Sequence, residues 1–387
     1  MITFRLCWFE TTQTLIEKQQ KWVDMTGLGI AVIGTGMIGR LHVRSARSAG
    51  ATLIGVGASD TERGARAAAE LGAGRVYARP EAVADDPDVD VVHICTPNAL
   101  HAPYARAALS AGKHVVCEKP LGLDLAEARE LYELAAEMGS VATVPFAYRF
   151  YPTVREARAR VADGRLGDVR LIHGSYLQDW LSAPDAHNWR VDAHSNGRSR
   201  AFADIGSHWC DLVEFVTGDR IVSVSAVLSA WHPRANGVEQ IDPAAPSTED
   251  VAVVMFVTET GATGSVVVSQ VSPGRKNRLW FELDGTDAST VFDQENPETL
   301  WLGRKDSATV LHRGQDPRSQ AAAALDVVPV GHPQGFTDCF ALFVAHTYAA
   351  IAGNTPDGLP TFADGLRSAH IVDAVLRSAS TGGFVKV

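Results

Sequence analysis

The chain has 387 residues, which is too long for one ordinary hydrophobic core and favours two domains. Hydrophobic residues make up 46% of it and charged residues 21%, a composition typical of globular proteins. The formal net charge of -10 argues against nucleic acid or an anionic membrane as the main partner. No apolar run approaches the roughly 18 residues that span a bilayer, so no membrane partner is expected either.

The five cysteines and the first residues bear on the compartment. The cysteines are scattered and show no CxxC or CxxH spacing, which favours reduced thiols in the cytoplasm and offers no zinc site. Residues 1–24 lack the basic start, apolar segment and cleavage site of a secretory signal. Met25 immediately precedes TGLGIAVIGTG, where a fold begins cleanly. We therefore interpret residues 1–24 as an over-long start or a disordered arm.

Residues 25–147 alternate between two kinds of pattern. The short runs GIAVIG, TLIGVGA, VDVVHICTP, HVVCEKP and VATVPFAY are rich in valine and isoleucine, and helical patterns lie between them. Such alternation predicts an α/β domain with a parallel sheet that carries helices on both faces.

A glycine-rich turn joins the first run to the first helical pattern in IAVIGTGMIGRLH. In such a turn the first glycine permits the sharp bend, the second admits a pyrophosphate and the third lets helix and strand pack closely. The motif alone is weak, since glycines also serve ordinary turns, but its strand–turn–helix setting favours dinucleotide binding. The candidate cofactor-binding residues here are Gly34, Thr35, Gly36, Met37, Ile38 and Gly39.

The second strand decides which dinucleotide is bound. An acidic residue about 20 positions after the glycines normally binds the adenine-side ribose. Asp60 lies at about that distance, but Ala58 and Ser59 are nearest the strand end. Ser59 and the nearby Arg63 could instead accept a 2′-phosphate, and Asp60 could merely cap the next helix. Ser59 and Asp60 are both candidate cofactor-binding residues, and NAD or NADP stays open.

From about residue 148 the pattern changes. After one helix, YPTVREARARVADG, come the long alternating runs VRLIHGSYLQDW, IVSVSAVLSAW, VAVVMFVTETGATGSVVVSQV and RLWFELDGT. TETGATG has the composition of a hairpin turn, so residues 148–387 are expected to form an α+β domain with an open, mainly antiparallel sheet. Two closing helices are expected near FTDCFALFVAHTYAAIAG and FADGLRSAHIVDAVLRSA, and loops at residues 234–250 and 303–335.

Two short segments carry candidate catalytic groups. In ADIGSHWCD the spacing puts Asp204, His208 and Asp211 on one face if a helix begins near Asp204. Histidine suits proton abstraction from an alcohol, and a neighbouring carboxylate can fix its tautomer. The plainer alternative is a helix cap at Asp204 and a satisfied, half-buried His208. A metal site is less favoured because D-x-x-x-H-x-x-D is a lean ligand set, so no metal is expected.

The second segment is HVVCEKP, a strand that ends in Glu118, Lys119 and Pro120. Ligands of parallel sheets bind at the carboxyl ends of the strands, where this segment lies. An ammonium group there can hydrogen-bond a reacting hydroxyl and stabilise the charge that develops as its proton leaves. A surface ion pair between Glu118 and Lys119 is the alternative.

Together these motifs resemble the glucose–fructose oxidoreductase / inositol dehydrogenase (Gfo/Idh/MocA) family from about residue 27 to the C-terminus. The matching segments are GTGMIG, CTPNALH, EKP, YRFYP, DIGSHWCD and PTFADGL, and the pairing of EKP with DIGSH is the specific part. The resemblance implies a doubly wound Rossmann domain followed by a domain whose open sheet mediates homo-oligomers, dimers or tetramers. It also implies NAD- or NADP-dependent oxidoreduction of a sugar, anhydrosugar or polyol.

The resemblance also assigns roles to individual residues. Lys119 becomes the active-site lysine and His208 the general acid/base, with Asp204 beside it; a cis Lys119–Pro120 bond is expected, as in relatives. The substrate-binding set is completed by Arg149 and Trp189. One departure is Ala147, where many members carry asparagine. The residues expected beside the nicotinamide and its ribose are Thr96, Pro97, Asn98, His101, Glu118, Lys119, Trp189 and Arg190.

The predicted mechanism is an alcohol oxidation in which His208 removes a proton from a hydroxyl held by Lys119 and Asp204. Trp180 and Trp209, near this segment in sequence, suit the C–H face of a carbohydrate or are simply core. Two alternatives remain: an NAD-dependent glycosidase that oxidises its sugar transiently, and a non-enzymatic ligand-sensing regulator. Retention of Lys119 together with His208 argues against the regulator.

Overall fold

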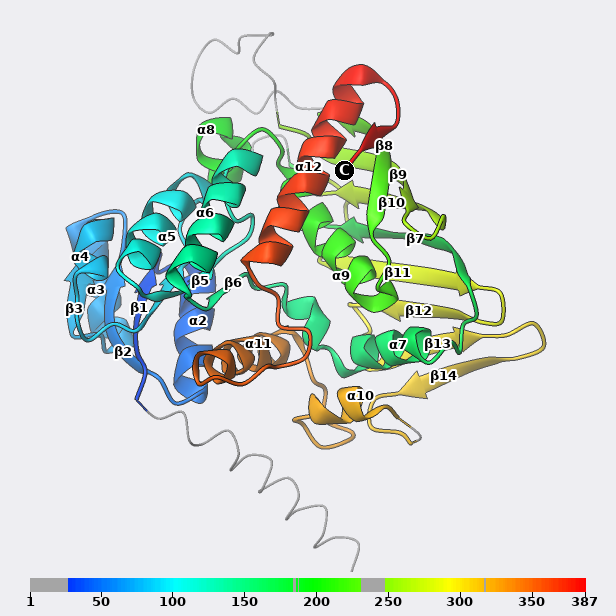
Figure 1. The fold of residues 1–387 in the computed structure, drawn as a ribbon, viewed down its shortest axis with the longest axis horizontal. Helices are drawn as coiled ribbons and strands as arrows, with labels where there is room; N and C mark the ends of the chain where they lie inside the picture. Colours follow the sequence, from blue (N-terminus) through cyan, green and yellow to red (C-terminus); the bar gives the residue numbers. More distant parts are fainter. Residues whose placement is uncertain (1–26, 184–185, 187, 231–247, 317) are drawn as a thin grey trace, which may run out of the picture.

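A computed structural model describes residues 27–183, 186, 188–230, 248–316 and 318–387 of the chain. Residues 1–24, expected to be an extension, and most of the loop expected at 234–250 lie outside the described residues. Figure 1 shows the two expected parts side by side, the first coloured blue to cyan and the second mainly green to yellow.

The first part is a six-stranded sheet in the order β3-β2-β1-β4-β5-β6, with every pair of neighbours parallel. The strand order reverses between β1 and β4, which is where ligands bind in doubly wound sheets. The predicted α/β fold of this part is confirmed. Its elements are β1 (Gly29–Ile33), α2 (Met37–Ser48), β2 (Thr52–Gly57), α3 (Thr61–Leu71), β3 (Arg75–Tyr77), α4 (Pro80–Ala84), β4 (Val91–Ile94), α5 (His101–Ser110), β5 (His114–Cys117), α6 (Leu125–Met138) and β6 (Ala142–Thr143).

The apolar runs of this sheet are buried on both faces. All five residues of β1 and all four of β4 are buried. Along β1 alternate side chains enter different cores: Ile30 and Val32 join one cluster, Ala31 and Ile33 the other. Side chains alternate across a strand, so a continuous apolar run is what a sheet between two helical layers needs.

The second part is a nine-stranded sheet in the order β14-β13-β12-β11-β7-β10-β9-β8-β15. All its described neighbour pairs are antiparallel except β7 and β10. The predicted hairpin turn joins β9 to β10 as expected. Its elements are α7 (Pro152–Ala162), β7 (Val169–Leu177), α8 (Ala193–Asn196), α9 (Ser207–Thr217), β8 (Ile221–Ser229), β9 (Val251–Thr258), β10 (Thr263–Ser269), β11 (Arg278–Gly285), β12 (Ser289–Asp293), β13 (Thr299–Gly303), β14 (Ala308–His312), α10 (Gln320–Ala324), α11 (Phe336–Ile351), α12 (Phe362–Thr381) and β15 (Val385–Lys386).

The expectation that residues 303–335 form only loops is wrong, because this stretch holds β14 and α10. Four of the five residues of β14 are exposed and none is buried. An edge strand without a buried face has no alternation of apolar and polar residues from which to predict it. Helix α10 has only five residues, which is too short for a helical period to be recognised in the sequence.

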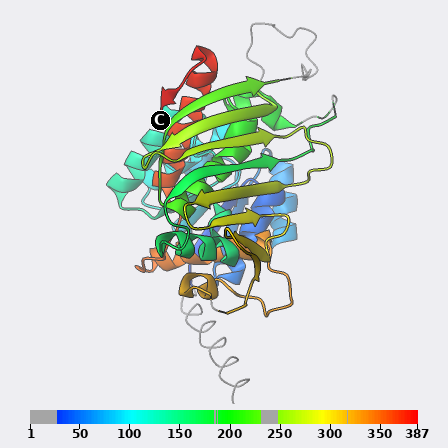
Figure 2. The same cartoon turned by 90° about the vertical axis from the view of Figure 1, so that its right-hand side faces the viewer.

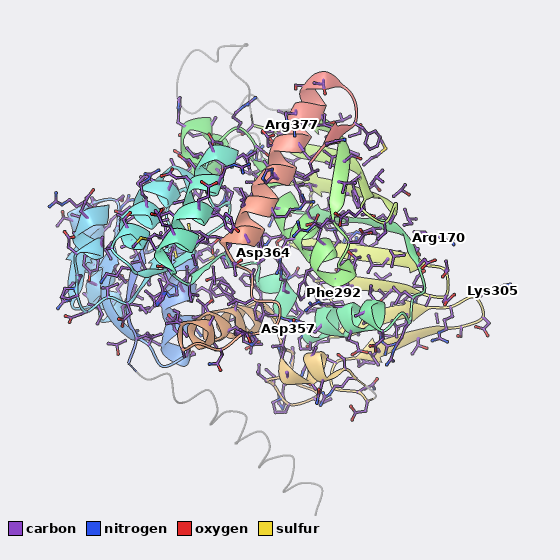
Figure 3. All side chains as sticks on the ribbon, in the orientation of Figure 1. Arg170, Phe292, Lys305, Asp357, Asp364 and Arg377 are labelled. Carbon is purple, nitrogen blue, oxygen red and sulfur yellow. The ribbon has the colours of Figure 1, made fainter. Side chains whose placement is uncertain are left out.

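The two faces of the nine-stranded sheet differ. Helices α7, α9 and α12 cover one face, and Figure 2 shows the opposite face in front of them. Phe292 of β12 is fully buried, whereas Lys305 lies at the tip of the hairpin that joins β13 to β14 (Figure 3). The helix-free face presents Val227 and Met255, which are 66% and 52% exposed. This face is therefore open in the single chain.

The two closing helices form as predicted and connect the two parts. Helix α11 packs against α2, and α12 packs against α6 as well as against α9 and β8. The end of the chain therefore returns to the first sheet and holds it against the second. Within the described residues, no helix is long and apolar enough to cross a bilayer.

Candidate active site

Two connected hollows lie at the carboxyl ends of the parallel strands. The larger hollow, of about 690 Å³, is lined by the glycine-rich turn, the end of β2 and the segments that follow β4 and β5. The smaller hollow, of about 480 Å³, extends towards the second sheet. The hollows share Met37, Ile38, Glu118, Lys119 and Arg190, so they adjoin each other.

The glycine-rich turn leaves room for a ligand at only one of its three glycines. A side chain at Gly34 would collide with the carbonyl oxygen of Cys95, and φ there is +96°. A side chain at Gly39 would collide with the carbonyl of Gly34. A Cβ atom at Gly36, the N-cap of α2, would meet nothing within 4 Å. Because the first N–H groups of a helix have no intrahelical partner, an anion can approach the backbone there.

The segment after β4 supplies a second wall of the larger hollow. Thr96, Pro97, Asn98 and His101 all line it. Asn98 donates to the carbonyl of Asn196 at 3.0 Å. The hydroxyl of Thr96 is buried and has no hydrogen-bond partner among the described residues. An unpartnered donor beside the open backbone at Gly36 fits a bound dinucleotide, which supplies both an anion and polar ribose groups.

His101 joins this wall to the segment after β5. Its Nδ1 lies 2.7 Å from the carbonyl oxygen of Pro120, and its Nε2 lies 3.0 Å from that of Thr96. The expected cis bond between Lys119 and Pro120 is present. His101 thus holds the two strand ends together from behind, rather than reaching freely into the hollow.

A buried chain of hydrogen bonds supports Glu118. His42 Nε2 lies 3.2 Å from the Glu118 carboxylate, its Nδ1 lies 2.9 Å from His93 Nδ1, and His93 Nε2 lies 2.8 Å from the Tyr348 hydroxyl. A carboxylate only accepts, so we assign His42 as donor to Glu118, His93 as donor to His42, and Tyr348 as donor to His93. Burial lowers the pKa of His93 well below its usual value, which keeps it neutral as this assignment requires.

Lys119 and Asp204, 85 positions apart in the chain, form an ion pair. The Lys119 ammonium donates to Asp204 Oδ1 at 2.6 Å and to its backbone carbonyl at 2.8 Å. Gln270 donates to Asp204 Oδ2 at 2.7 Å, and Arg190 Nε lies 3.6 Å from Oδ1. Burial alone raises the pKa of Asp204, but the charges of Lys119 and Arg190 outweigh it and hold this pKa well below its usual range.

His208 lines the smaller hollow together with Lys119 and Asp204. It is 8% exposed, and Phe146 and Tyr148 contact its ring edge-on at 5.6 and 5.1 Å between centroids. Burial, and next the Lys119 ammonium, lower the pKa of His208 to about 3. Its imidazole is therefore neutral at physiological pH, the form that accepts a proton.

Asp204 does not orient the imidazole as expected. Its two carboxylate oxygens are engaged by Lys119 and Gln270, and His208 Nδ1 is buried without a partner among the described residues. The sequence spacing put the three groups on one face, but it could not tell that a π-helical turn, Phe202–Gly206, precedes α9. The histidine is held by aromatic edges rather than by a carboxylate.

One further expectation, the role of Arg149, is corrected by the same region. Asp211 accepts from Arg149 Nε at 2.8 Å, and Arg149 also donates to Asp364 at 2.7 Å. Arg149 is 7% exposed and lines neither hollow. The expected role of Arg149 in substrate binding is therefore not met; it joins α9 to the start of α12. The position in YRFYP gave no sign of which way the side chain turns.

Of the remaining residues expected at the site, some line a hollow and others only support the fold. Ser59 lines the larger hollow, whereas Asp60 does not; its carboxylate caps α3 by accepting from the Arg63 N–H at 2.8 Å. Trp189 lines the larger hollow and Trp180 the smaller. The third tryptophan of this region, Trp209, is fully buried core.

A neutral polar network in the smaller hollow was not anticipated. The hydroxyls of Tyr148 and Tyr176 lie 2.6 Å apart, and the Asn277 Oδ1 accepts from Tyr176 and from Gln178, both at 2.8 Å. All four residues line the hollow. They come from three separate segments, so no motif in the sequence could have indicated them.

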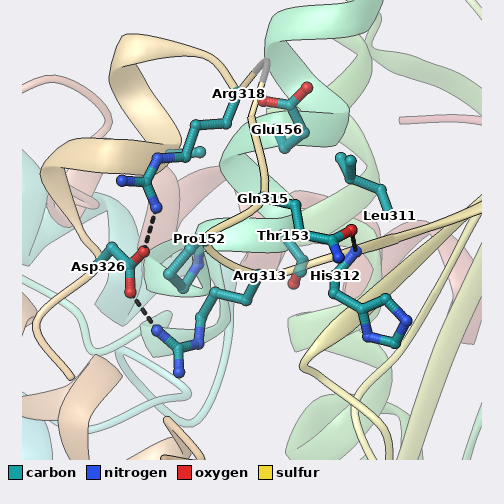
Figure 4. Close-up of a pocket in the computed structure, with 11 residues that line it drawn as sticks. Pro152, Thr153, Glu156, Leu311, His312, Arg313, Gln315, Arg318 and Asp326 are labelled. Atoms are coloured by element: carbon teal, nitrogen blue, oxygen red, sulfur yellow. Dashed lines mark hydrogen bonds and ion pairs between the residues drawn. The ribbon is translucent and has the colours of Figure 1, made fainter. Parts of the chain in front are cut away.

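Two other sites of the described chain are poor alternatives. A cavity of about 20 Å³ beside α7 and β14 holds about one water molecule. Asp326 pairs with Arg313 and Arg318 there, as Figure 4 shows, so its charged groups are already satisfied. On the second sheet, His173, Glu282 and Asp284 lie close enough to one another to hold a metal ion, but none of them lines either hollow.

Comparison with known proteins agrees with this architecture. Residues 28–146 match the oxidoreductase family with an NAD-binding Rossmann fold, and residues 154–291 match the GFO/IDH/MocA C-terminal domain. The chain is 30% identical to levoglucosan dehydrogenase of Pseudarthrobacter phenanthrenivorans, over 94% of this chain and 99% of the relative. It is also 30% identical to 1,5-anhydro-D-fructose reductase of Ensifer adhaerens, over 91% of this chain and 96% of that one.

Solved structures give the same result. A levoglucosan dehydrogenase in complex with NADH and L-sorbose has a TM-score of 0.85 at 31% identity, covering 94% of this chain and 99% of that chain. An inositol dehydrogenase homologue of Azotobacter vinelandii in complex with NADH and myo-inositol has a TM-score of 0.81 at 30% identity, covering 94% and 98%. The matched sequence and the shared fold together show that this chain belongs to the Gfo/Idh/MocA family of oxidoreductases.

Proposed function

We propose that the protein is an NAD- or NADP-dependent dehydrogenase of a neutral sugar, anhydrosugar or polyol. The observation that carries this proposal is that Lys119, Asp204 and His208 line one hollow, and that this hollow shares an edge with the one that fits a dinucleotide. The relatives described above are dehydrogenases or a reductase of such compounds.

The proposed chemistry is a reversible alcohol oxidation. A nicotinamide dinucleotide held by the glycine-rich turn and the segments after β4 and β5 would supply the hydride acceptor for the substrate carbon, and the hydride donor in the reverse direction. Lys119 donates a hydrogen bond to the reacting oxygen and stabilises the negative charge that grows on it. His208, neutral at physiological pH, takes the hydroxyl proton, so that the alcohol loses one proton to the protein and one hydride to the cofactor. Asp204 keeps the ammonium in place.

The substrate class follows from the lining of the smaller hollow. Tyr148, Tyr176, Gln178 and Asn277 offer uncharged donors and acceptors, which suit several hydroxyl groups. Trp180 also lines this hollow and offers an aromatic face to C–H groups. Lys119 and Arg190, the cations that line it, are already paired with the Asp204 carboxylate, which disfavours a phosphorylated or carboxylated sugar.

The test is formation of reduced cofactor by the purified protein with levoglucosan, L-sorbose, myo-inositol and related polyols, each with NAD and with NADP. Cofactor-dependent oxidation of at least one of them, or reduction of the matching ketone, is expected. Release of free sugar from a glycoside without net cofactor reduction would identify a glycosidase instead. Ligand binding with no turnover in either direction would identify a sensor and contradict the proposal.

We also propose that the protein works as a homo-oligomer in the cytoplasm, paired through the helix-free face of the second sheet. Val227, Val253 and Val267 form a row across β8, β9 and β10 and are 66%, 43% and 39% exposed. Such an apolar row is costly in water. Light scattering should give a dimer or tetramer and Val253→Glu a monomer; a monomeric wild type would contradict this. The four described cysteines are free, which suits the reducing cytoplasm.

A further inference from the structure

We infer that Gln270 is a positioning residue of the proposed reaction, which acts on the Lys119 ammonium by fixing the direction of the Asp204 carboxylate. This inference rests on the proposed function and assigns a role in it to a side chain outside both hollows. Gln270 directly follows β10, is fully buried and lines neither hollow. It reaches the smaller hollow through Asp204, whose Oδ2 accepts from the Gln270 amide at 2.7 Å.

The direction of this carboxylate decides what Lys119 can offer to a substrate. An ammonium group has three N–H donors. Lys119 gives one to Asp204 Oδ1 at 2.6 Å and one to the Asp204 backbone carbonyl at 2.8 Å. The third is left for the reacting oxygen in the smaller hollow, which Lys119 lines. If the carboxylate turned, the ammonium would turn with it, and a displacement of about 1 Å at a reacting group can cost about 10²-fold in rate.

Two donors hold the two oxygens of the Asp204 carboxylate. Lys119 holds Oδ1 and Gln270 holds Oδ2. Arg190 makes a weaker contact, since its Nε lies 3.6 Å from Oδ1. Without Gln270, Oδ2 would keep no hydrogen bond within the described part of the chain, and the carboxylate could rotate about its last bond. The Gln270 amide therefore fixes this rotation.

The amide of Gln270 can point only one way. Its oxygen accepts from Arg200 Nη1 at 3.2 Å, and a guanidinium has donors but no acceptor. The NH₂ group must therefore face Asp204, because a reversed amide would set oxygen against oxygen at one end and N–H against N–H at the other. Arg200 is itself fully buried, pairs with Asp250 and donates from Nε to the Thr248 hydroxyl at 3.3 Å. A buried ion pair thus sets the direction of the donor.

The alternative is that Gln270 merely satisfies Arg200 in the core. A buried amide needs hydrogen-bond partners, so its loss would lower the stability of the fold in either case. A packing role predicts a loss of stability alone, whereas the positioning role predicts a loss of turnover that depends on Asp204. A double-mutant cycle separates these two roles.

The experiment is such a cycle on the full chain, measured by steady-state kinetics with levoglucosan, L-sorbose or myo-inositol, whichever the wild type turns over fastest. Gln270→Met removes the donor and keeps a side chain of similar length, so kcat should fall about tenfold, the worth of one charge-assisted hydrogen bond. The KM for the dinucleotide should not change, because Gln270 does not line the larger hollow. In the Asp204→Ala background, Gln270→Met should change kcat by less than about twofold.

Gln334→Met is the matched control. Gln334 is buried as well, its amide donates to the Leu325 carbonyl at 2.8 Å and accepts from the Val327 N–H at 3.1 Å, and it lines neither hollow. This variant should lower the unfolding temperature about as much as Gln270→Met and leave kcat unchanged. Gln270→Asn keeps the amide but is too short to reach both partners, so it should lose kcat as Gln270→Met does. It takes the place of Gln270→Met if that variant does not fold.

Three outcomes would overturn the inference. They are a wild-type kcat in Gln270→Met, an equal loss from Gln270→Met with and without Asp204, and a loss of kcat in Gln334→Met as large as that in Gln270→Met. In each case the wild type still turns over its substrate, so the dehydrogenase proposal stands. No turnover by the wild type with any of the three compounds and either cofactor would instead contradict the proposed function, and this inference with it.

Discussion

The larger and the smaller hollow are built in different ways. The larger hollow depends on backbone: Gly34 and Gly36 shape a turn between a strand and the helix that directly follows it. The smaller hollow depends on side chains brought from far apart, such as Lys119 after β5, Asp204 before α9 and Gln270 after β10. Local structure can be predicted from local sequence, whereas a set of distant side chains depends on the whole fold. The comparison predicts that substitutions in the smaller hollow abolish turnover while dinucleotide binding persists.

The largest effect is expected for His208→Gln. This change removes the proposed base but keeps a polar side chain of similar length, and loss of a general base lowers kcat by about 10²–10⁴-fold. Dinucleotide affinity should stay unchanged, because His208 lines only the smaller hollow. Steady-state kinetics and a cofactor titration measure the two quantities. His173→Gln, on the second sheet, is the matched control and should turn over at the wild-type rate. A His208→Gln variant with the wild-type rate would show that catalysis does not require the His208 imidazole.

Lys119→Met should have the next largest effect. It keeps the aliphatic stem and removes the donor proposed to stabilise the developing oxyanion, which costs about 10²–10³-fold in kcat. It also leaves the buried Asp204 with Gln270 and Arg190 as its remaining partners, so the pKa of Asp204 should rise. Lys305→Met, at the exposed hairpin tip in Figure 3, should be neutral. Turnover of Lys119→Met at the wild-type rate would show that this ammonium does not stabilise the reacting oxygen.

The depressed pKa of His208 predicts a pH-dependent stability. The folded pKa is about 3 and the unfolded value is about 6.5, so the unfolded chain binds more protons between these values. The wild type should therefore lose stability as pH falls below about 6.5, by about 2–3 kcal/mol from this residue at two pH units lower. The His208→Gln variant should lack this part of the pH-dependent loss of stability. Urea unfolding of both proteins at neutral and at acidic pH measures it; equal losses would show that His208 is not held neutral by burial.

The same contrast explains how much of the site could be predicted from the sequence. The turn at Gly34, Gly36 and Gly39 and the strand-end position of Lys119 follow from motifs whose geometry is local. The joint placement of Lys119 and His208 on one hollow agrees with the resemblance, not with any spacing rule. Arg149 was misassigned because only tertiary structure shows that it faces Asp211 and Asp364.

The neutral network and the histidine chain were missed for the same reason. Asn277, Tyr176 and Gln178 lie on neighbouring strands of the second sheet or at their ends, and nothing local marks them as partners. His93 sits inside the apolar run of β4, where a lone histidine is usually a satisfied core residue; its partner Tyr348 is 255 positions away. The sequence shows polar residues inside apolar runs, but it does not show which residues are their partners.

The smallest effect is expected at the far end of the chain that supports Glu118. Tyr348→Phe removes the hydroxyl that donates to His93 and leaves a buried acceptor unpaired, which costs about 1–3 kcal/mol of stability. Because His42 then loses a fixed partner, Glu118 should be held less firmly, and the KM for the dinucleotide should rise a few-fold with little change in kcat. Tyr151→Phe is the matched control: it removes another buried hydroxyl, one outside the histidine chain, and should not change this KM. Equal KM values in the two variants would mean that the histidine chain serves packing alone, and that the larger hollow depends on its backbone and not on buried side chains behind it.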